Sequence, residues 1–150
     1  MTTDNGNDDT RSVSALDDPR LPDAIRRVLR HSQTVDITTT GRRTGAPRRI
    51  EIVMHSFDGR LYISGIPNPD RERAWLLNLR DEPRLTLHLK QLIQADVPAS
   101  AREITDDAER RRVLEKIARV WRRELEPMVA HSPLIEVTPS LPASDPLTSA

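Results

Sequence analysis

Hydrophobic and polar residues alternate along much of the chain, and this alternation predicts β-strands. The clearest case is the segment 84–90, in which Leu85, Leu87 and Leu89 alternate with polar or charged residues. Successive side chains of a strand point to opposite faces, so the pattern predicts a strand with one buried face. Five further strands are predicted by the same criterion: 34–40, 48–55, 60–64, 93–101 and 133–137.

Glycine and proline residues separate these segments at short intervals. Asp58-Gly59 is a hairpin signal, and Gly41 and Gly45 mark a turn between the first two strands. Pro98 falls within the fifth strand, which predicts a bulge or an edge position there. Because hairpins dominate over strand–helix–strand units, the pattern favours a small, mostly antiparallel barrel over a doubly wound parallel sheet.

Three segments have helical periodicity instead. The first begins at Pro22, a residue suited to the first helical turn. The second covers 71–80 with Asp70 as its cap, and the third begins at Thr105 or Asp106 and is bounded by Pro127. The expected fold class is therefore α+β, with six strands in a mostly antiparallel barrel and three flanking helices.

The two ends of the sequence are polar and lack apolar periodicity. Residues 1–18 are acidic, and residues 139–150 are rich in proline and serine. Such segments bury too little apolar surface to offset the entropy of ordering themselves. We expect disordered tails at 1–18 and 139–150 around one cofactor-binding domain at 19–138, which is an ordinary size for a single core.

Composition excludes several classes of partner. Basic and acidic residues balance at 23 each, and only four aromatic residues are available for base stacking, so nucleic acid is not expected as a partner. The chain has no cysteine, which excludes disulfides, a thiolate nucleophile and cysteine-based metal sites. No segment approaches the ~20 apolar residues that span a bilayer, and the acidic N-terminus does not match a signal peptide. A cytoplasmic location is expected.

Common catalytic and nucleotide-binding motifs are missing from the sequence. GxGxxG, GxxxxGK[ST], GxSxG and HExxH do not occur. The four histidines lie far apart in the sequence, and no metal site is predicted from them.

The segment GRRTGAPRR at 41–49 is the strongest candidate for a binding site. Arg42, Arg43, Arg48 and Arg49 flank a turn, where Thr44 and backbone amides near the glycines could join them around an anionic group. The alternative is a solvated hairpin, because 21 of the 23 basic residues are arginine and the bias is general. The spacing alone leaves both interpretations open.

Two blocks give the chain a resemblance to a known family. TTTGRRTGAPRR and AWLLNLRDEPRLTLHL, with DGRLYISG between them, resemble the deazaflavin-dependent nitroreductases, which are deazaflavin- or flavin-binding split β-barrel oxidoreductases. The resemblance covers residues 38–102 and implies a split β-barrel fold. It implies that the turn binds the phosphate side of a cofactor tail and that the third strand and second helix line the cofactor pocket. The implied cofactor-binding residues are Arg42, Arg43, Thr44, Gly45, Arg48, Ser64, Gly65, Trp75 and Asn78.

Trp75 and Asn78 also have structural interpretations. A tryptophan among leucines usually packs in a core, and an asparagine in a helix often makes a cap or a buried hydrogen bond.

The resemblance also implies an activity. Reduced deazaflavin (coenzyme F-420), or alternatively FMN, would pass hydride to an electron-poor small molecule such as a quinone or a nitro compound, and the barrel would form a homodimer, as split barrels often do. One alternative is a non-catalytic carrier of deazaflavin or flavin, and another is an interaction module with a purely structural hairpin.

Two departures from the family concern the catalytic residues. SGIPNPD replaces an SKGG-like segment, and the C-terminal region lacks the family's tyrosines. The remaining candidates for a proton donor are His55, His131 and Tyr62, each of which is interpreted as structural. No catalytic residue is assigned.

Overall fold

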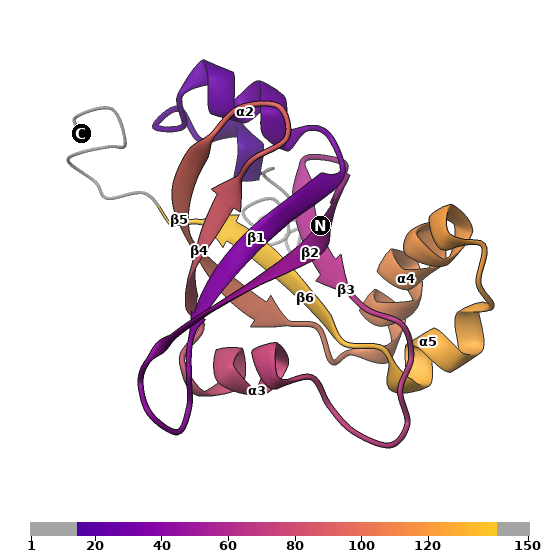
Figure 1. The fold of residues 1–150 in the computed structure, drawn as a ribbon. Coiled ribbons are helices and arrows are strands. Elements are labelled where there is room, and N and C mark those ends of the chain that lie inside the picture. Colours follow the sequence, from indigo (N-terminus) through magenta and orange to yellow (C-terminus); the bar gives the residue numbers. More distant parts are fainter. Residues whose placement is uncertain (1–14, 141–150) are drawn as a thin grey trace, which may run out of the picture.

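A computed structural model describes residues 15–140 of the 150-residue chain. Its elements follow one another along the chain as shown in Figure 1. They are the 3-10 helix η1 (Ala15–Asp17), α2 (Asp23–Leu29), β1 (Gln33–Thr40), β2 (Pro47–Phe57), β3 (Arg60–Ser64), α3 (Ala74–Asp81), β4 (Arg84–Leu89), β5 (Ala95–Glu103), α4 (Asp107–Trp121), α5 (Leu125–His131) and β6 (Leu134–Pro139).

The six strands form one closed barrel in the order β1-β2-β3-β6-β5-β4. Every neighbouring pair is antiparallel. Three of the pairs join strands that follow one another directly in the chain, whereas β1 with β4, β3 with β6 and β5 with β6 join more distant segments. The structure confirms the predicted six-stranded antiparallel barrel.

The apolar members of each alternating pattern fill the barrel. Val35 and Ile37 of β1, Leu61 and Ile63 of β3 and Leu87 of β4 are all fully buried. Each such side chain stabilises the fold by about 1.5–3 kcal/mol relative to an exposed position. The inward-facing half of each strand therefore makes the core, and the outward-facing half is left for polar chemistry.

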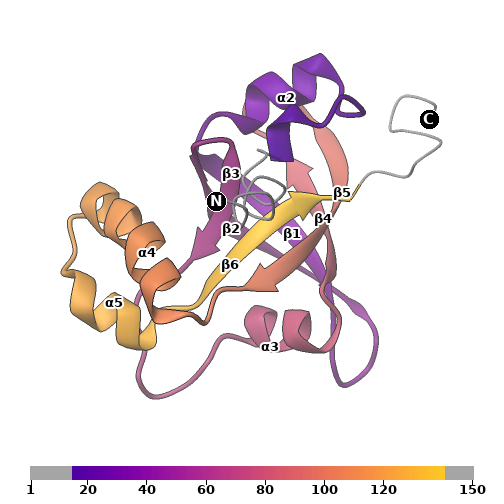
Figure 2. The same cartoon turned by 180° about the vertical axis from the view of Figure 1, so that it is seen from behind.

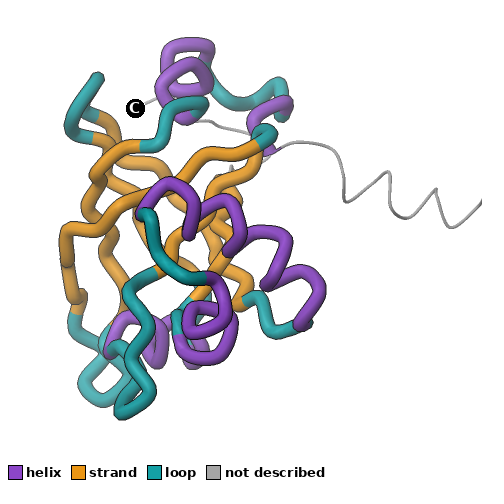
Figure 3. Tube along the Cα trace, turned by 90° about the vertical axis from the view of Figure 1, so that its right-hand side faces the viewer, coloured by secondary structure: helices purple, strands orange, loops and turns teal. Residues whose placement is uncertain are grey.

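The helices cover three different parts of the barrel. α2 and α3 lie at opposite ends, and α4 with α5 lies beside β3 and β6, as Figures 1 and 2 show from two sides. Figure 3 shows α4 and α5 in front of the strands. A second apolar cluster joins this pair to the barrel, and it consists of Tyr62, Ile104, Val113, Leu114, Ile117, Ala118, Met128 and Leu134.

Pro98 forms no bulge, and the predicted edge exists only locally, because β5 pairs with β6 from Ala99 onward. It lies in β5, opposite Thr86, and the pairing of β5 with β4 runs one to one. Its carbonyl oxygen accepts a hydrogen bond from Ser140 N at 2.8 Å, so its nitrogen also faces β6. The ladder between β5 and β6 ends at Pro139, and the missing N–H lies just beyond that end. The proline therefore removes no bond to β4.

α3 begins three residues later than predicted, and Asp70 does not cap it. The residue before the helix is Arg73, whose carbonyl oxygen accepts from the backbone N–H groups of Leu76 and Leu77. The N–H of Asp70 instead donates to Asn68 Oδ1 at 3.0 Å. This local side-chain bond favours a turn in the segment before the helix.

The predicted helix 105–127 is two helices. α4 is capped by Asp106, whose carboxylate accepts from Glu109 N, and it ends where Arg122 takes a left-handed conformation with φ 56°. Arg123 N then donates to Ala118 O at 2.9 Å, which closes the helix end. Pro127 lies in the first turn of α5, where a missing N–H breaks no helical bond. Residues 15–140 thus contain four α-helices in place of the predicted three.

The folded part of the chain begins before residue 19. Leu16 of η1 is fully buried in the barrel core, and Arg26 donates to the carbonyl oxygens of Leu16 and Asp18. The predicted tails at residues 1–14 and 141–150 lie outside the described residues. Among residues 15–140, no helix is both long and apolar enough to cross a bilayer.

Candidate functional site

The arginine-rich turn joins β1 to β2 through a closed loop at residues 41–46. Gly41 N donates to Ala46 O at 2.8 Å, and Gly45 N donates to Gly41 O at 2.8 Å. Thr44 Oγ1 accepts from Ala46 N at 3.1 Å. Gly45 has φ 78°, a conformation that side-chain-bearing residues rarely adopt. These bonds give the turn a defined shape at one end of the barrel.

Asn78 of α3 fastens this turn to the helix. Its Oδ1 accepts from the backbone N–H of Arg42 at 3.1 Å, and its Nδ2 donates to Thr39 Oγ1 at 3.1 Å. Asn78 is 4% exposed and Thr39 is 2% exposed, so both groups depend on each other for hydrogen bonding. The structural interpretation of Asn78 as a buried hydrogen-bonding residue is confirmed. One of its partners, the backbone N–H of Arg42, belongs to the candidate turn.

A cavity of about 320 Å³ lies between the turn and α3, and we call it the turn cavity. Six of the predicted cofactor-binding residues line it. The full lining consists of Thr39, Gly41, Arg42, Arg43, Thr44, Arg48, Ile50, Ala74, Trp75 and Asn78. The lining combines arginine side chains with the apolar residues Ile50, Ala74 and Trp75.

Three arginines of the turn cavity have no partner in the described part of the chain. Arg42, Arg43 and Arg48 are exposed, and within residues 15–140 their guanidinium groups make no hydrogen bond or ion pair. Arg49 differs, because its Nε donates to Asp36 Oδ2 at 2.9 Å on the outer face of the barrel. The alternation along β2 therefore separates Arg48 from Arg49, and only Arg48 faces the cavity.

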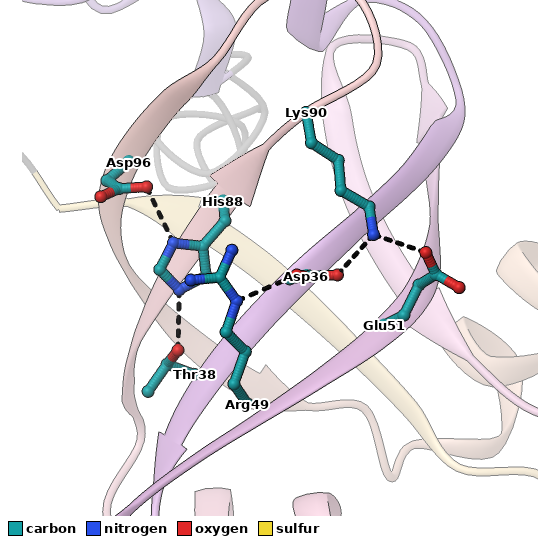
Figure 4. Close-up of polar contacts among 7 residues, drawn as sticks. All are labelled: Asp36, Thr38, Arg49, Glu51, His88, Lys90 and Asp96. Carbon is teal, nitrogen blue, oxygen red and sulfur yellow. Dashed lines mark hydrogen bonds and ion pairs between the residues drawn. The ribbon is translucent and has the colours of Figure 1, made fainter.

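The outer face that holds Arg49 carries a polar network across β2, β1, β4 and β5, shown in Figure 4. His88 contacts Thr38 Oγ1 through Nε2 at 2.7 Å and Asp96 Oδ1 through Nδ1 at 2.8 Å. Lys90 donates to Asp36 and Glu51 on the same face. The order Thr38–His88–Asp96 matches that of a nucleophile, a base and an orienting acid. None of these residues lines the turn cavity, and the network instead joins neighbouring strands.

Three predicted site residues lie outside the lining of the turn cavity. Gly45 shapes the turn through its positive φ. Ser64 is buried, and its hydroxyl donates to Pro133 O at 2.6 Å at the start of β6. Gly65 lies against the guanidinium of Arg73, since a Cβ at Gly65 would be 2.9 Å from Arg73 Nη2. The structure brings the turn and α3 together and places the end of β3 elsewhere.

Trp75 packs in the core, as its structural interpretation predicts, and its role toward a cofactor stays a prediction. It is 8% exposed, belongs to the core cluster and also lines the turn cavity. Thr39 and Ile50 line the cavity as well, although no sequence argument had assigned them a role. Thr39 has a recognisable signal, because it is a polar residue in register with the buried Val35 and Ile37. A polar side chain on the inward face of a strand requires a buried partner, and here the partner is Asn78.

The three residues considered as proton donors lie away from the turn cavity. His55 is 2% exposed, stacks on Phe57 and meets Trp121 edge-on, and burial lowers its pKa to about 4. Tyr62 is buried, and burial together with the charge of Glu136 raises its pKa. His131 is exposed at the end of α5. Among residues 15–140, no group of three His, Asp or Glu side chains is placed to hold a metal ion.

Solved structures share the fold at low sequence identity. A protein from Listeria innocua assigned as a pyridoxamine 5'-phosphate oxidase is 18% identical, with a TM-score of 0.60 over 79% of this chain and 92% of that chain. A structure described as an F-420 reductase is 16% identical, with a TM-score of 0.59 over 80% of this chain and 96% of that one. An F-420-H2-dependent reductase is 19% identical, with a TM-score of 0.54 over 69% and 92%. No curated protein has a significant match to the chain.

These similarities place the chain in the class of split β-barrel proteins. The family follows from the sequence: the model of the F420H(2)-dependent quinone reductase family matches residues 22–126, and the chain belongs to this family of enzymes. The match spans the turn, β3 and α3, and it confirms the resemblance to deazaflavin-dependent oxidoreductases. The cofactor of the family is reduced coenzyme F-420.

Proposed function

We propose that the turn cavity binds the anionic tail of reduced coenzyme F-420 and that the chain reduces a quinone with it. The observation that carries this proposal is a set of three guanidinium groups in the cavity lining, those of Arg42, Arg43 and Arg48, which have no ion-pair partner among residues 15–140. Guanidinium groups bind phosphate and carboxylate in bidentate geometry and are the usual choice for such anions.

The rest of the lining suits the same ligand. Thr44 provides a hydroxyl next to the arginines, and Ile50, Ala74 and Trp75 provide an apolar wall. Binding pockets commonly combine an apolar lining with a few placed polar groups. The donor set therefore fits a cofactor with an anionic tail and an apolar portion.

The chemistry of hydride transfer belongs to the reduced deazaflavin when it is bound. The arginines of the turn bind the tail, and Asn78 keeps the turn fixed against α3. Trp75 and the other apolar residues of the lining exclude water from the cavity. Gly41 is part of this arrangement, because a Cβ there would lie 3.0 Å from Ala46 O and would press on Arg48. Roles for Ser64 and Gly65 beside the cofactor remain predictions.

The acceptor is a small molecule, as the family description implies. A quinone is proposed from that description, and a nitro compound is the second acceptor class to be compared. A cytoplasmic location and a homodimer also remain predictions.

A titration with paired variants tests the proposed site. We expect the purified protein to bind coenzyme F-420 in the micromolar range, followed by its fluorescence, and to bind FMN more weakly. Arg42→Gln combined with Arg48→Gln should weaken binding at least roughly a hundredfold, because each charged hydrogen bond contributes about 1.5–3 kcal/mol. Arg49→Gln is the matched control, since Arg49 faces away from the cavity.

The outcome also separates enzyme from carrier. Acceptor-dependent oxidation of the bound reduced cofactor by a quinone is the expected result. Binding without such oxidation would support a non-catalytic carrier. Equal affinity of the double variant and the wild type would contradict the assignment of the turn and would favour a structural hairpin.

A further inference from the structure

A second and larger cleft lies on the other side of α3. Its volume is about 570 Å³, and it is bounded by the loop between β3 and α3 and by the junction of α5 with β6. Figure 1 shows this loop running past α5 to α3. Asn68 N donates to His131 O at 3.3 Å and joins the two walls. The lining includes Leu76, whereas Ala74, Trp75 and Asn78 face the turn cavity.

Two of the acidic residues in this cleft are already neutralised. Arg80 Nη2 donates to Glu72 at 2.6 Å, and its Nε donates to Glu103 at 2.7 Å. Arg80 is not part of the cleft lining, so it holds both carboxylates from outside. Their negative charge is therefore largely unavailable to a ligand in the cleft.

One of the cleft's arginines is also occupied. Arg110 donates to the main-chain oxygens of Ile104, Val129 and Ser132 at 2.8–3.1 Å. It has a structural role at the end of α5 and offers no free face for a ligand. The charged groups that remain in the cleft are Arg71, Arg73 and Asp70.

Arg73 is the most unusual of these. It is half-buried, and within residues 15–140 its guanidinium makes no hydrogen bond or ion pair. Burial without a counter-charge lowers its pKa. The guanidinium lies against Gly65, where any Cβ would come within 2.9 Å of Nη2. A partly buried and uncompensated cation costs free energy, which a bound anion would recover.

We propose that this cleft binds a small molecule that carries a carboxylate or phosphate on an apolar body. Arg73 and the exposed Arg71 hold the anion, and Pro69, Leu76 and Val129 contact the apolar part. Asp70, whose carboxylate also lacks a partner among the described residues, opposes binding and limits affinity. The lining of this cleft shares no residue with that of the turn cavity and uses different arginines, so anion binding here can be tested without the cofactor.

Side-chain NMR of arginine tests this proposal on the intact protein. The probes are benzoate and phenyl phosphate, with neutral benzamide as the control. Both anions should shift the Nε–Hε resonance of Arg73, and benzamide should not. Arg73→Gln should weaken anion binding roughly tenfold or more. Arg27→Gln, an exposed arginine on α2 at the opposite end of the barrel, should leave it unchanged.

Two further variants change the space around Arg73 and the charge opposite the bound anion. Gly65→Ala should weaken binding while keeping the charge of Arg73, because the new methyl group displaces the flexible end of that side chain. Asp70→Asn should strengthen binding. Thermal unfolding checks that each variant is folded.

The anion in this cleft could belong either to the cofactor or to the acceptor, and addition of coenzyme F-420 distinguishes the two. Displacement of benzoate by the cofactor would assign the cleft to a distant anionic group of the cofactor, and simultaneous binding would assign it to the acceptor. The proposal is overturned if Arg73→Gln binds the anions as the wild type does, or if the shifts occur only at Arg42 and Arg48.

Discussion

Asn78 links two elements through a single amide group. One side of the amide holds the backbone of Arg42 and the other holds Thr39 at the end of β1. The helix, the strand and the turn therefore share one buried polar group, and the position of Arg42 depends on it. A buried amide without its partners would cost about 1–3 kcal/mol.

Asn78→Ala should lower both stability and cofactor affinity. We expect the free energy of unfolding to fall by about 1–3 kcal/mol, because Thr39 loses its buried partner. Affinity for coenzyme F-420 should fall as well, because the turn is no longer fixed to α3. Urea unfolding and fluorescence titration measure the two effects.

Thr39→Val is the matched control for this prediction. It removes the hydroxyl but keeps the bond from Arg42 N to Asn78 Oδ1. Stability should fall in this variant, while cofactor affinity should fall less than in Asn78→Ala, because Thr39 lines the cavity but the turn stays fixed to α3. Equal loss of affinity in both variants would show that the Arg42 contact has no special role.

At the scale of elements, the packing of α4 against the barrel involves a buried histidine. His55 of β2 contacts Trp121 at 5.1 Å between ring centroids, and no hydrogen-bond partner reaches its Nε2 within the described residues. Desolvation lowers its pKa from 6.5 to about 4. The protonated form is therefore unfavourable in the folded state.

Stability should decrease as the pH falls through this range. The unfolded chain binds a proton on His55 near pH 6.5 and the folded chain only near pH 4, so the stabilisation is complete above pH 6.5 and is lost between these values. The loss attributable to His55 should be about 2 kcal/mol at pH 5. Urea unfolding of the wild type and His55→Leu at pH 7.5 and pH 5 measures it, and parallel slopes in the two proteins would contradict the assignment.

Arg110 of α4 connects α4 to α5 through hydrogen bonds to main-chain oxygens. Its guanidinium donates to the carbonyl oxygens of Val129 and Ser132 at the end of α5, where helix carbonyl groups lack helical partners, and to that of Ile104 in the segment before α4. Arg110→Met should destabilise the protein by at least about 1.5–3 kcal/mol, because several carbonyl groups lose a charged donor. Hydrogen exchange should show the loss first in α5.

Arg112→Met provides the comparison for Arg110. It lies on the same helix and is exposed, with no hydrogen bond or ion pair among the described residues. We expect its effect on the free energy of unfolding to stay within ~0.5 kcal/mol. If the two variants were equally stable, the carbonyl contacts of Arg110 would not stabilise α5.

At the scale of the whole molecule, charge is balanced but unevenly placed. The formal net charge is zero, so long-range attraction of anions is weak. Most described acidic residues lie in ion pairs, such as Asp36 with Arg49 and Glu103 with Arg80, whereas the turn cavity gathers unpaired arginines. Anion recognition is therefore local.

Cofactor affinity should depend on salt through this local cluster. We expect severalfold weaker binding of coenzyme F-420 at 0.5 M than at 0.05 M salt, because the exposed arginines are screened. Arg48→Gln should reduce the salt dependence, whereas Arg49→Gln should not. Isothermal titration at several salt concentrations gives the comparison, and an unchanged slope for Arg48→Gln would contradict a role for its charge.

Local patterns of the sequence predict most of the strands but not all element boundaries. The alternation around Leu85 and Leu87 reports burial directly, and so the strands are recognisable. The break at Arg122 was missed because a left-handed arginine carries no sequence signal. The late start of α3 was missed because Asp70 resembles a cap, while Asn68 closes a turn there instead. Barrel closure depends on pairs between distant strands, which no local pattern encodes.

The candidate site was predictable only where its residues lie close together in the sequence or belong to a family motif. The arginines of the turn are adjacent in sequence, and the resemblance added Trp75 and Asn78 from α3. That Asp36 pairs with Arg49, and not with Arg48, depends on the register between β1 and β2. No local sequence pattern marks Arg73 as a site residue. Its surroundings are formed by Gly65 and by residues 129–133, which are distant from it in the sequence.

The position of β6 in the barrel has a consequence for synthesis. β3 and β5 both pair with β6, yet β6 follows them in the chain by about 70 and 30 residues. Until residues 134–139 leave the ribosome, β3 and β5 each present an unpaired edge, a state that invites pairing with other chains. Folding of this barrel is thus completed only after residues 134–139 have been synthesised, and nascent chains that stop before Leu134 are the ones most exposed to aggregation.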